Sequence, residues 1–258
     1  MIPPRSRKLS EFKVQLTFHG DLPFFLKSKR AQIERSLSER TSVKDVIEAC
    51  GVPHTEVDMI LANGEAVDFR HVIGSPTSID VFPVERNRIT SFQENRLQIP
   101  EIRNFVADGH LGKLVRDLRL LGANVAYDRD AEDRQLIVVA TAENRALLTR
   151  DRRLLMHSAV QHGYYLRSQN PLEQTVEVIR RFDLAPRLAP FSRCLRCNAP
   201  LEPAPKENVL GELEPLTKIY YDEFRRCGGC GQIYWSGSHF EKLQRRIETI
   251  RSRLEEEA

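Results

Sequence analysis

Long apolar runs are missing from this 258-residue chain, and no stretch approaches the roughly 18 consecutive apolar residues of a membrane-spanning helix. The opening residues, MIPPRSRKLSEF, carry charge but no apolar core of the kind found in a secretory signal peptide. We therefore expect a cytoplasmic protein without a membrane partner. An excess of one charge is also missing, since the net charge is only +3, so bulk charge does not support nucleic-acid binding.

Cysteine is scarce, and four of the five cysteines fall into two pairs, Cys194-x-x-Cys197 and Cys227-x-x-Cys230. In a cytosolic protein, where disulfides are rare, such pairs more often bind metal. The two pairs supply the four thiolates of a tetrahedral structural site, so we predict that they bind Zn²⁺. A closed site of this kind leaves no position open for a substrate, so this metal is not the catalyst. A redox pair and free thiols are the alternatives.

The first part of the chain, residues 1–88, is predicted to form a small α+β domain. FKVQLTF alternates like a strand, LPFFL can pair with it across the turn at 19–21, and TSVKDVIEACG is typical of a capped helix. A hairpin around Asn63–Gly64 and a strand in TSIDVFPV complete an order that resembles the ubiquitin-like β-grasp fold. No Gly-Gly follows the last strand, which leaves conjugation chemistry without a residue to carry it. We expect this domain to bind a protein or RNA partner, with a purely structural role as the alternative.

Residues 89–100 are polar, end in Pro100 and are predicted to be a linker. Strand and helix patterns then alternate through residues 101–188, which favours a parallel sheet flanked by helices. The first of these helices, LGKLVRDLRLLG, places its apolar side chains on one face; these are Leu111, Leu114, Val115, Leu118 and Leu121. Residues 189–240 contain the cysteine pairs. Residues 241–258 are predicted to form a charged, largely solvated helix with a narrow apolar seam.

Each of the first three strands expected after residue 100 runs into an acid. Asp108 follows NFVA, Asp128 and Asp130 follow NVAY, and Asp151 comes just past ALLT, while Asp133 begins the intervening helix. Because the carboxyl ends of parallel strands share one edge, we expect Asp108, Asp133 and Asp151 to converge. Clustered carboxylates repel one another unless a cation holds them, and oxygen ligands suit Mg²⁺ or Mn²⁺. Taken singly, each acid is more simply explained as a loop or helix-capping residue.

Arginines accompany these acids. Arg150, Arg152 and Arg153 surround the third acid, and Arg119 lies on the polar side of the first helix after the linker. Arginine suits bidentate contact with phosphate. We predict that Arg119 and Arg150 bind the substrate, whereas a solvated face is the better explanation for the other two.

Three motifs together resemble one known family. They are FVADGHLGKLVRDLRLLGANVAYDRD, NRALLTRDRRLL, and the two cysteine pairs with the closing IYWSGSH. Their combination resembles the Mut7-C RNase family, which is similar to PIN-domain nucleases and carries a zinc ribbon. The preceding segment resembles the ubiquitin-like domain often fused to it, so the match runs from Phe12 to His239. The chain departs from the family at Asp117, where relatives tend to carry an aromatic or apolar residue.

The resemblance implies an α/β PIN-like parallel-sheet domain with a C-terminal zinc ribbon, and a metal-dependent ribonuclease activity. The catalytic, metal-binding acids of such a site fall on Asp108, Asp133 and Asp151. The leading hypothesis is an endoribonuclease that hydrolyses phosphodiester bonds of RNA, such as tRNA or mRNA, with Mg²⁺ or Mn²⁺. The alternative is a non-catalytic RNA-binding or adaptor protein that uses the zinc ribbon and the β-grasp domain. A phosphatase is disfavoured, since no Asp-x-Asp-x-Thr run follows the first of these strands.

Overall fold

The computed structural model describes residues 11–84, 96–98 and 101–256. The chain divides into two compact units, the first comprising Met1–Pro100 and Asp151–Tyr165, and the second comprising Glu101–Arg150 and Leu166–Ala258. The predicted domain bounds, 1–88, 101–188 and 189–240, stay a prediction. Every described helix is too short or too polar to cross a membrane.

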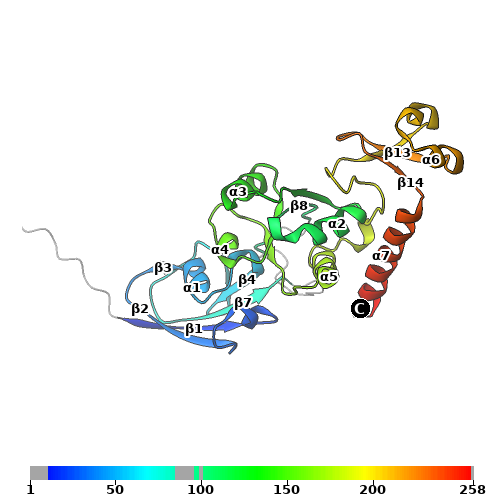
Figure 1. Cartoon of the computed structure of the whole chain (residues 1–258). Helices are drawn as coiled ribbons and strands as arrows, with labels where there is room; N and C mark the ends of the chain where they lie inside the picture. The colour runs from blue at the N-terminus through cyan, green and yellow to red at the C-terminus, as the bar shows by residue number, and fades with distance from the viewer. Residues whose placement is uncertain (1–10, 85–95, 99–100, 257–258) are drawn as a thin grey trace, which may run out of the picture. The chain divides into compact units, whose positions relative to one another are not determined.

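The first unit is built on a mixed five-stranded sheet, drawn in blue and cyan in Figure 1. In spatial order its strands are β2 (Gln32–Leu37), β1 (Phe12–Phe18), β7 (Thr77–Pro83), β4 (Val57–Ala62) and β5 (Glu65–Val67). Strand β1 runs antiparallel to β2 and parallel to β7. Strands β3 (Thr41–Ser42) and β6 (Val72–Ile73) form a separate pair, and η2 (His54–Glu56) is a 3-10 turn.

Local sequence patterns explain most of this unit. The inward residues of β1 are buried, and helix α1 (Val43–Ala49) begins where the Ser42 hydroxyl accepts a hydrogen bond from the Asp45 amide at 3.1 Å. The predicted hairpin at Asn63–Gly64 is confirmed, with both residues at positive φ. The prediction for LPFFL is wrong. Leu22–Phe25 form the 3-10 helix η1, which Pro23 favours near its start, and β2 is the real partner of β1.

The predicted linker falls partly outside the described residues, since 85–95 and 99–100 are not among them. The residues that are described, 96–98, pack on the first unit. Arg96 Nε donates to the buried carboxylate of Asp58 at 2.9 Å. The side-chain amide of Gln98 donates to the carbonyl oxygens of His54 and Val57, each at 3.1 Å. Polar contacts therefore anchor this short stretch to the first unit.

The second unit contains a parallel sheet, as predicted. Strand β8 (Asn104–Ala107) lies between β9 (Asn124–Tyr127) and β10 (Ala146–Thr149), and all residues of β10 are buried. The helices of this part are η4 (Gly109–Leu111), α2 (Gly112–Leu120), α3 (Asp133–Ala142), α5 (Pro171–Arg181) and η5 (Ala185–Arg187). The five leucine and valine residues assigned to the inner face of α2 are all buried, which confirms its predicted orientation.

The end of the second unit is a small antiparallel sheet followed by a long helix. Its strands are β12 (Leu201–Ala204), β13 (Phe224–Cys227) and β14 (Ile233–Trp235), and its helices are η6 (Lys206–Asn208), η7 (Leu210–Glu212), α6 (Pro215–Tyr220) and α7 (Ser238–Glu255). Ile247 and Ile250 of α7 are buried, so the predicted seam is confirmed. Helix α7 is also held by ion pairs to α2 and α5, through Arg246 to Asp117 and through Arg253 to Glu173.

Candidate functional site

Asp108 lies at the carboxyl edge of the parallel sheet. It follows the last residue of β8, and its Oδ2 accepts a hydrogen bond from the Thr149 hydroxyl at 2.7 Å. Thr149 is fully buried and is the last residue of β10, the neighbouring strand. The carboxyl ends of β8 and β10 therefore lie next to each other at this edge. No sequence pattern indicated that Thr149 would bind the carboxylate, because a Thr at a strand end is common.

Two glycines bring the loop after β9 against the turn that follows Asp108. A Cβ on Gly109 would lie 2.3 Å from the carbonyl oxygen of Arg129, and a Cβ on Gly112 would lie 2.8 Å from the Tyr127 hydroxyl. That hydroxyl donates to the Gly109 carbonyl at 2.8 Å. The glycines in DGHLG therefore allow the turn that follows Asp108 to pack closely against the loop that contains Asp128 and Asp130.

Gly109→Ala is expected to lower the stability of the second unit by about 1–3 kcal/mol, because the Arg129 backbone must move to make room for the added methyl group. Gly211→Ala is the matched control, since a Cβ there meets no atom within 4 Å. Denaturant unfolding of both variants measures the difference. Equal midpoints for the two variants would contradict the packing argument.

The other acids of this edge are exposed. Asp128 Oδ1 accepts a hydrogen bond from the Asp130 amide at 3.1 Å, which closes a tight turn. Asp133 is the first residue of α3, but the cap is Glu132, whose side chain and that of Gln135 form a capping box. The Asp133 carboxylate is thus not used as the helix cap.

Asp151 belongs to the first unit, whereas Asp108 and Asp133 belong to the second. Its Oδ1 accepts from the amides of Arg153 and Leu154, at 2.7 and 3.4 Å, and so caps α4 (Arg152–Leu155). Across the part of the chain that the structure describes, the four paired cysteines are the one group of three or more His, Cys, Asp or Glu residues whose ligand atoms all lie within 4.8 Å of one another. Convergence of the three acids on a cation therefore stays a prediction.

The two arginines expected to bind phosphate have structural contacts instead. Arg119 is 4% exposed, burial lowers its pKa, and its guanidinium donates to the carbonyl oxygens of Val125 and Arg196, each at 2.8 Å. Arg150 Nη1 donates to three successive carbonyl oxygens, those of residues 166–168, at 3.1, 3.0 and 2.5 Å. These contacts give both side chains a structural role, and their predicted contact with substrate stays a prediction. Helix periodicity placed Arg119 on a polar face, but it did not reveal that residues 195 and 196 would contact its side chain.

The four cysteines form a compact metal centre. The Sγ atoms of Cys194 and Cys230 are 3.6 Å apart, and those of Cys197 and Cys227 are 3.3 Å apart. Thiolates about 2.3 Å from a tetrahedral zinc ion would be about 3.8 Å apart, so the group fits zinc in both chemistry and size. The amides of residues 229 and 230 each donate to Cys227 Sγ at 3.4 Å. These four residues can bind a structural metal such as zinc.

Tyr234 supports this centre from one side. Its hydroxyl lies 3.1 Å from Cys194 Sγ and accepts a hydrogen bond from the Leu195 amide at 3.2 Å. Burial raises the pKa of Cys194, but the Tyr234 hydroxyl and the backbone amides of Cys197 and Arg196 outweigh burial and lower that pKa to about 6. Burial and the same contact raise the pKa of Tyr234.

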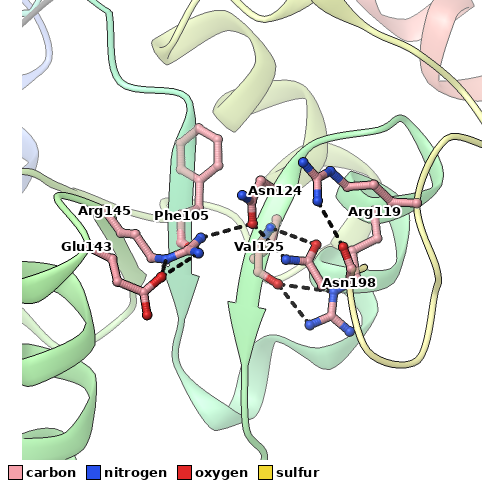
Figure 2. A network of polar contacts seen from close by, with 8 residues as sticks. Phe105, Arg119, Asn124, Val125, Glu143, Arg145 and Asn198 are labelled. Carbon is pink, nitrogen blue, oxygen red and sulfur yellow. Dashed lines mark hydrogen bonds and ion pairs between the residues drawn. The ribbon is translucent and has the colours of Figure 1, made fainter. Parts of the chain in front are cut away.

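The first cysteine loop is fixed to the sheet by a polar network (Figure 2). Asn198, at φ +72°, accepts from the Val125 amide at 3.0 Å and donates to Asn124 Oδ1 at 2.7 Å. Arg145 donates to the same Asn124 oxygen at 3.0 Å and to the Phe105 carbonyl at 3.1 Å. Asn198, next to Cys197, thus joins the first cysteine loop to β9, and Arg145 extends the network to β8.

This network lies at the opposite edge of the sheet from Asp108. Asn124 is the first residue of β9, whereas Asp128 follows the last one. A four-residue strand separates its two ends by about 10 Å. The metal centre therefore supports the amino edge, and the acids occupy the carboxyl edge, which agrees with a structural rather than catalytic role for the cysteines.

The chain thus combines a unit with a mixed sheet, a unit with a parallel sheet that has an acid at its carboxyl edge, and a group of four cysteines. The Mut7-C RNAse domain model matches residues 103–247, and the Mut7-C ubiquitin model matches residues 12–89. The chain belongs to the Mut7-C RNase family, which confirms the resemblance seen in its motifs. Comparison with curated proteins finds no match. Family membership supports ribonuclease activity and implies RNA as the substrate.

Proposed function

We propose that this protein is a divalent-metal-dependent endoribonuclease with a PIN-like fold, which hydrolyses RNA phosphodiester bonds at the acid edge of the second unit. The observation that carries the proposal is the position of Asp108, a half-buried carboxylate at the end of a parallel strand within a Mut7-C RNAse domain. Open α/β sheets place their sites at this edge. The first unit is proposed to have the β-grasp fold and to bind a protein or RNA partner, and the protein is proposed to act in the cytoplasm on tRNA or mRNA.

The residues proposed to hold Mg²⁺ or Mn²⁺ are Asp108, Asp133 and Asp151. Their carboxylate oxygens are the hard ligands that these ions prefer, and such an ion supplies water activation and neutralises charge at the scissile phosphate. The Thr149 hydroxyl holds one oxygen of Asp108, which keeps the carboxylate in one orientation while its second oxygen takes a ligand. The exposed Asp133 adds negative charge at the start of α3, where the helix dipole favours it.

The test is RNA cleavage by zinc-loaded protein as Mg²⁺ or Mn²⁺ is titrated. We expect cleavage to require one of these ions and to fall by about 100-fold in Asp108→Asn, which corresponds to roughly 3 kcal/mol of transition-state stabilisation. The variant keeps the size of the side chain and an oxygen for Thr149. Asp222→Asn is the control, because this exposed acid pairs with Lys206 near the cysteine centre. Full cleavage by Asp108→Asn, or cleavage without added ion, would refute the proposal.

A non-catalytic RNA-binding or adaptor function is the second candidate. It is favoured by the absence, among residues 11–84, 96–98 and 101–256, of a set of three carboxylates whose ligand atoms lie within 4.8 Å. It predicts RNA binding without cleavage at any concentration of either ion. The titration above therefore separates the two candidates directly.

A further inference from the structure

A large groove lies within the second unit, on the segment that contains the cysteines. Strands β12, β13 and β14, helix α6 and the start of α7 line it, together with Arg116 of α2. Its volume is about 1280 Å³, which exceeds the roughly 300–1,000 Å³ of a pocket for a small molecule. The groove therefore has room for a segment of a polymer.

Two large aromatic side chains of this groove are open to solvent. Tyr220 is 71% exposed and Trp235 is 38% exposed. Gly237 allows the indole to lie close to the start of α7, because a Cβ there would be 2.9 Å from Trp235 Nε1 and 3.5 Å from the Tyr221 hydroxyl. The groove thus presents rings on which the bases of a nucleic acid can stack.

Two arginines from separate elements line the same groove. Arg225 Nη1 donates to a backbone carbonyl at 3.1 Å, which holds its guanidinium beside the groove. Arg116 is exposed and makes no hydrogen bond or ion pair with any residue that the structure describes. Of the two acids in the lining, Asp222 is paired with Lys206 at 2.7 Å, so the arginines outweigh the remaining acid, Glu223. Guanidinium groups beside exposed rings suit a ligand that carries both phosphates and bases.

We infer that this groove binds single-stranded RNA at a position separate from the acid edge where cleavage is proposed. A single strand offers unstacked bases to the rings, whereas a duplex keeps its bases stacked inside. Asn198 joins this segment to the amino edge of the parallel sheet, and Asp108 lies at the carboxyl edge. Helix α2 begins after one edge, ends before the other and carries Arg116, so it offers a path for the strand. The inference rests on the proposed function for RNA as the substrate, and it gives the nuclease a second RNA contact.

The first experiment uses the fluorescence of Trp235, which is the only tryptophan of the chain, in full-length, zinc-loaded protein. Single-stranded RNA of about 12 nucleotides is added without Mg²⁺ or Mn²⁺, so that binding is measured apart from cleavage. We expect saturable quenching, because a base stacked on the indole quenches its emission, and little quenching by a duplex of the same sequence. RNA that does not bind, or that binds without quenching, would overturn the inference.

Variants then measure the contribution of the rings. Tyr220→Ala and Trp235→Ala should each weaken binding of labelled RNA by about tenfold, as measured by fluorescence anisotropy. Leu210→Ala is the matched control, because Leu210 lies in the same segment and is also 38% exposed but does not line the groove. The high exposure of Tyr220 keeps the test valid if Trp235→Ala fails to fold. Equal affinity of the Tyr220→Ala and Leu210→Ala variants would contradict stacking in the groove.

The salt dependence of binding tests the arginines. Arg116→Ala should reduce the slope of log affinity against log salt by about 0.7, which is the share of one phosphate contact with a single strand. Arg251→Ala, at an exposed arginine of α7 outside the groove, should leave the slope unchanged. Equal slopes for these two variants would contradict phosphate contact by Arg116.

A cleavage assay separates this inference from the proposed function. Trp235→Ala should raise KM about tenfold for the same RNA and leave kcat unchanged, because the groove is remote from the scissile bond. A wild type that shows quenching but no cleavage would uphold the groove and refute the proposed hydrolysis. A wild type that cleaves RNA with the same KM as Trp235→Ala would uphold hydrolysis and refute the groove.

Discussion

Removal of zinc from the reduced protein is expected to unfold the cysteine-containing segment, residues 193–235, and to destabilise the sheet to which it is attached. Metal-binding free energy in small zinc modules amounts to roughly 10–16 kcal/mol at neutral pH, and it is folding free energy because the unfolded chain has no preformed site. The apolar cluster of the segment is small, with Val209, Leu213, Phe224 and Ile233 as its buried members. It cannot replace the metal.

The loss should spread beyond the cysteines. Asn198 and Arg119 connect the first cysteine loop to the start of β9. A disordered loop therefore leaves the Val125 amide without Asn198 and the Arg119 guanidinium without the Arg196 carbonyl. Buried backbone groups that lose their partners cost about 1–3 kcal/mol each. We therefore expect a lower unfolding midpoint for β8, β9 and α2 as well as for the cysteine segment.

The measurement is zinc content together with thermal unfolding. Purified protein should contain close to one zinc per chain, and Cys227→Ser should lose the zinc and the structure of residues 193–235. Cys50→Ser is the control, because Cys50 lies in the first unit and is not a member of the metal centre. Reduced, unchelated protein without zinc, or a Cys227→Ser variant as stable as Cys50→Ser, would show that the cysteines do not hold a structural metal.

The elements and the acid at the end of β8 could be predicted from the sequence because they depend on local patterns. The 3.6-residue period of α2 gave its buried face, and alternating strand and helix segments gave a parallel sheet. In such a sheet the residue after each strand must lie at one edge, which gave Asp108 its place. The LPFFL segment shows the limit of this reasoning, since a short apolar run fits either a strand or a turn, and Pro23 decided for the turn.

The roles of the arginines could not be predicted in the same way. Arg119 and Arg150 donate to carbonyl oxygens, some of them more than 70 residues away, and every residue offers such an oxygen. No pattern in the side chains marks these partners. Arg152 was expected on a solvated face for the same reason, yet three rings surround it.

Asp117 is explained by a partner far along the chain. It is 7% exposed, and Arg246 of α7 donates to its Oδ2 through Nε at 3.1 Å and through Nη2 at 2.5 Å. The Thr175 hydroxyl lies 3.4 Å from the same oxygen. These contacts raise the pKa of Arg246, chiefly through the hydrogen bond to Asp117. Asp117, which departs from the family pattern, therefore links helix α7 to α2 and α5.

Arg246→Met is expected to destabilise the second unit by about 2–3 kcal/mol, because it leaves the Asp117 carboxylate buried without its cation. Breaking a fully buried pair costs roughly 3–5 kcal/mol, and the value is reduced here because the Arg246 side chain is 32% exposed. Denaturant unfolding measures the loss, and Arg253→Met is the control on the same helix. Arg253 pairs with a Glu173 that is itself 32% exposed, so its removal should cost less than about 1 kcal/mol.

The double variant Asp117→Leu, Arg246→Met completes the test. Removing both charges and filling their place with apolar side chains should restore stability to within about 1 kcal/mol of the wild type, since a buried ion pair gains little over well-packed apolar groups. Such recovery would show that Asp117 needs Arg246 only because it is buried. If Arg246→Met costs no more than Arg253→Met, the Asp117 carboxylate finds other compensation and α7 is held mainly by Ile247 and Ile250.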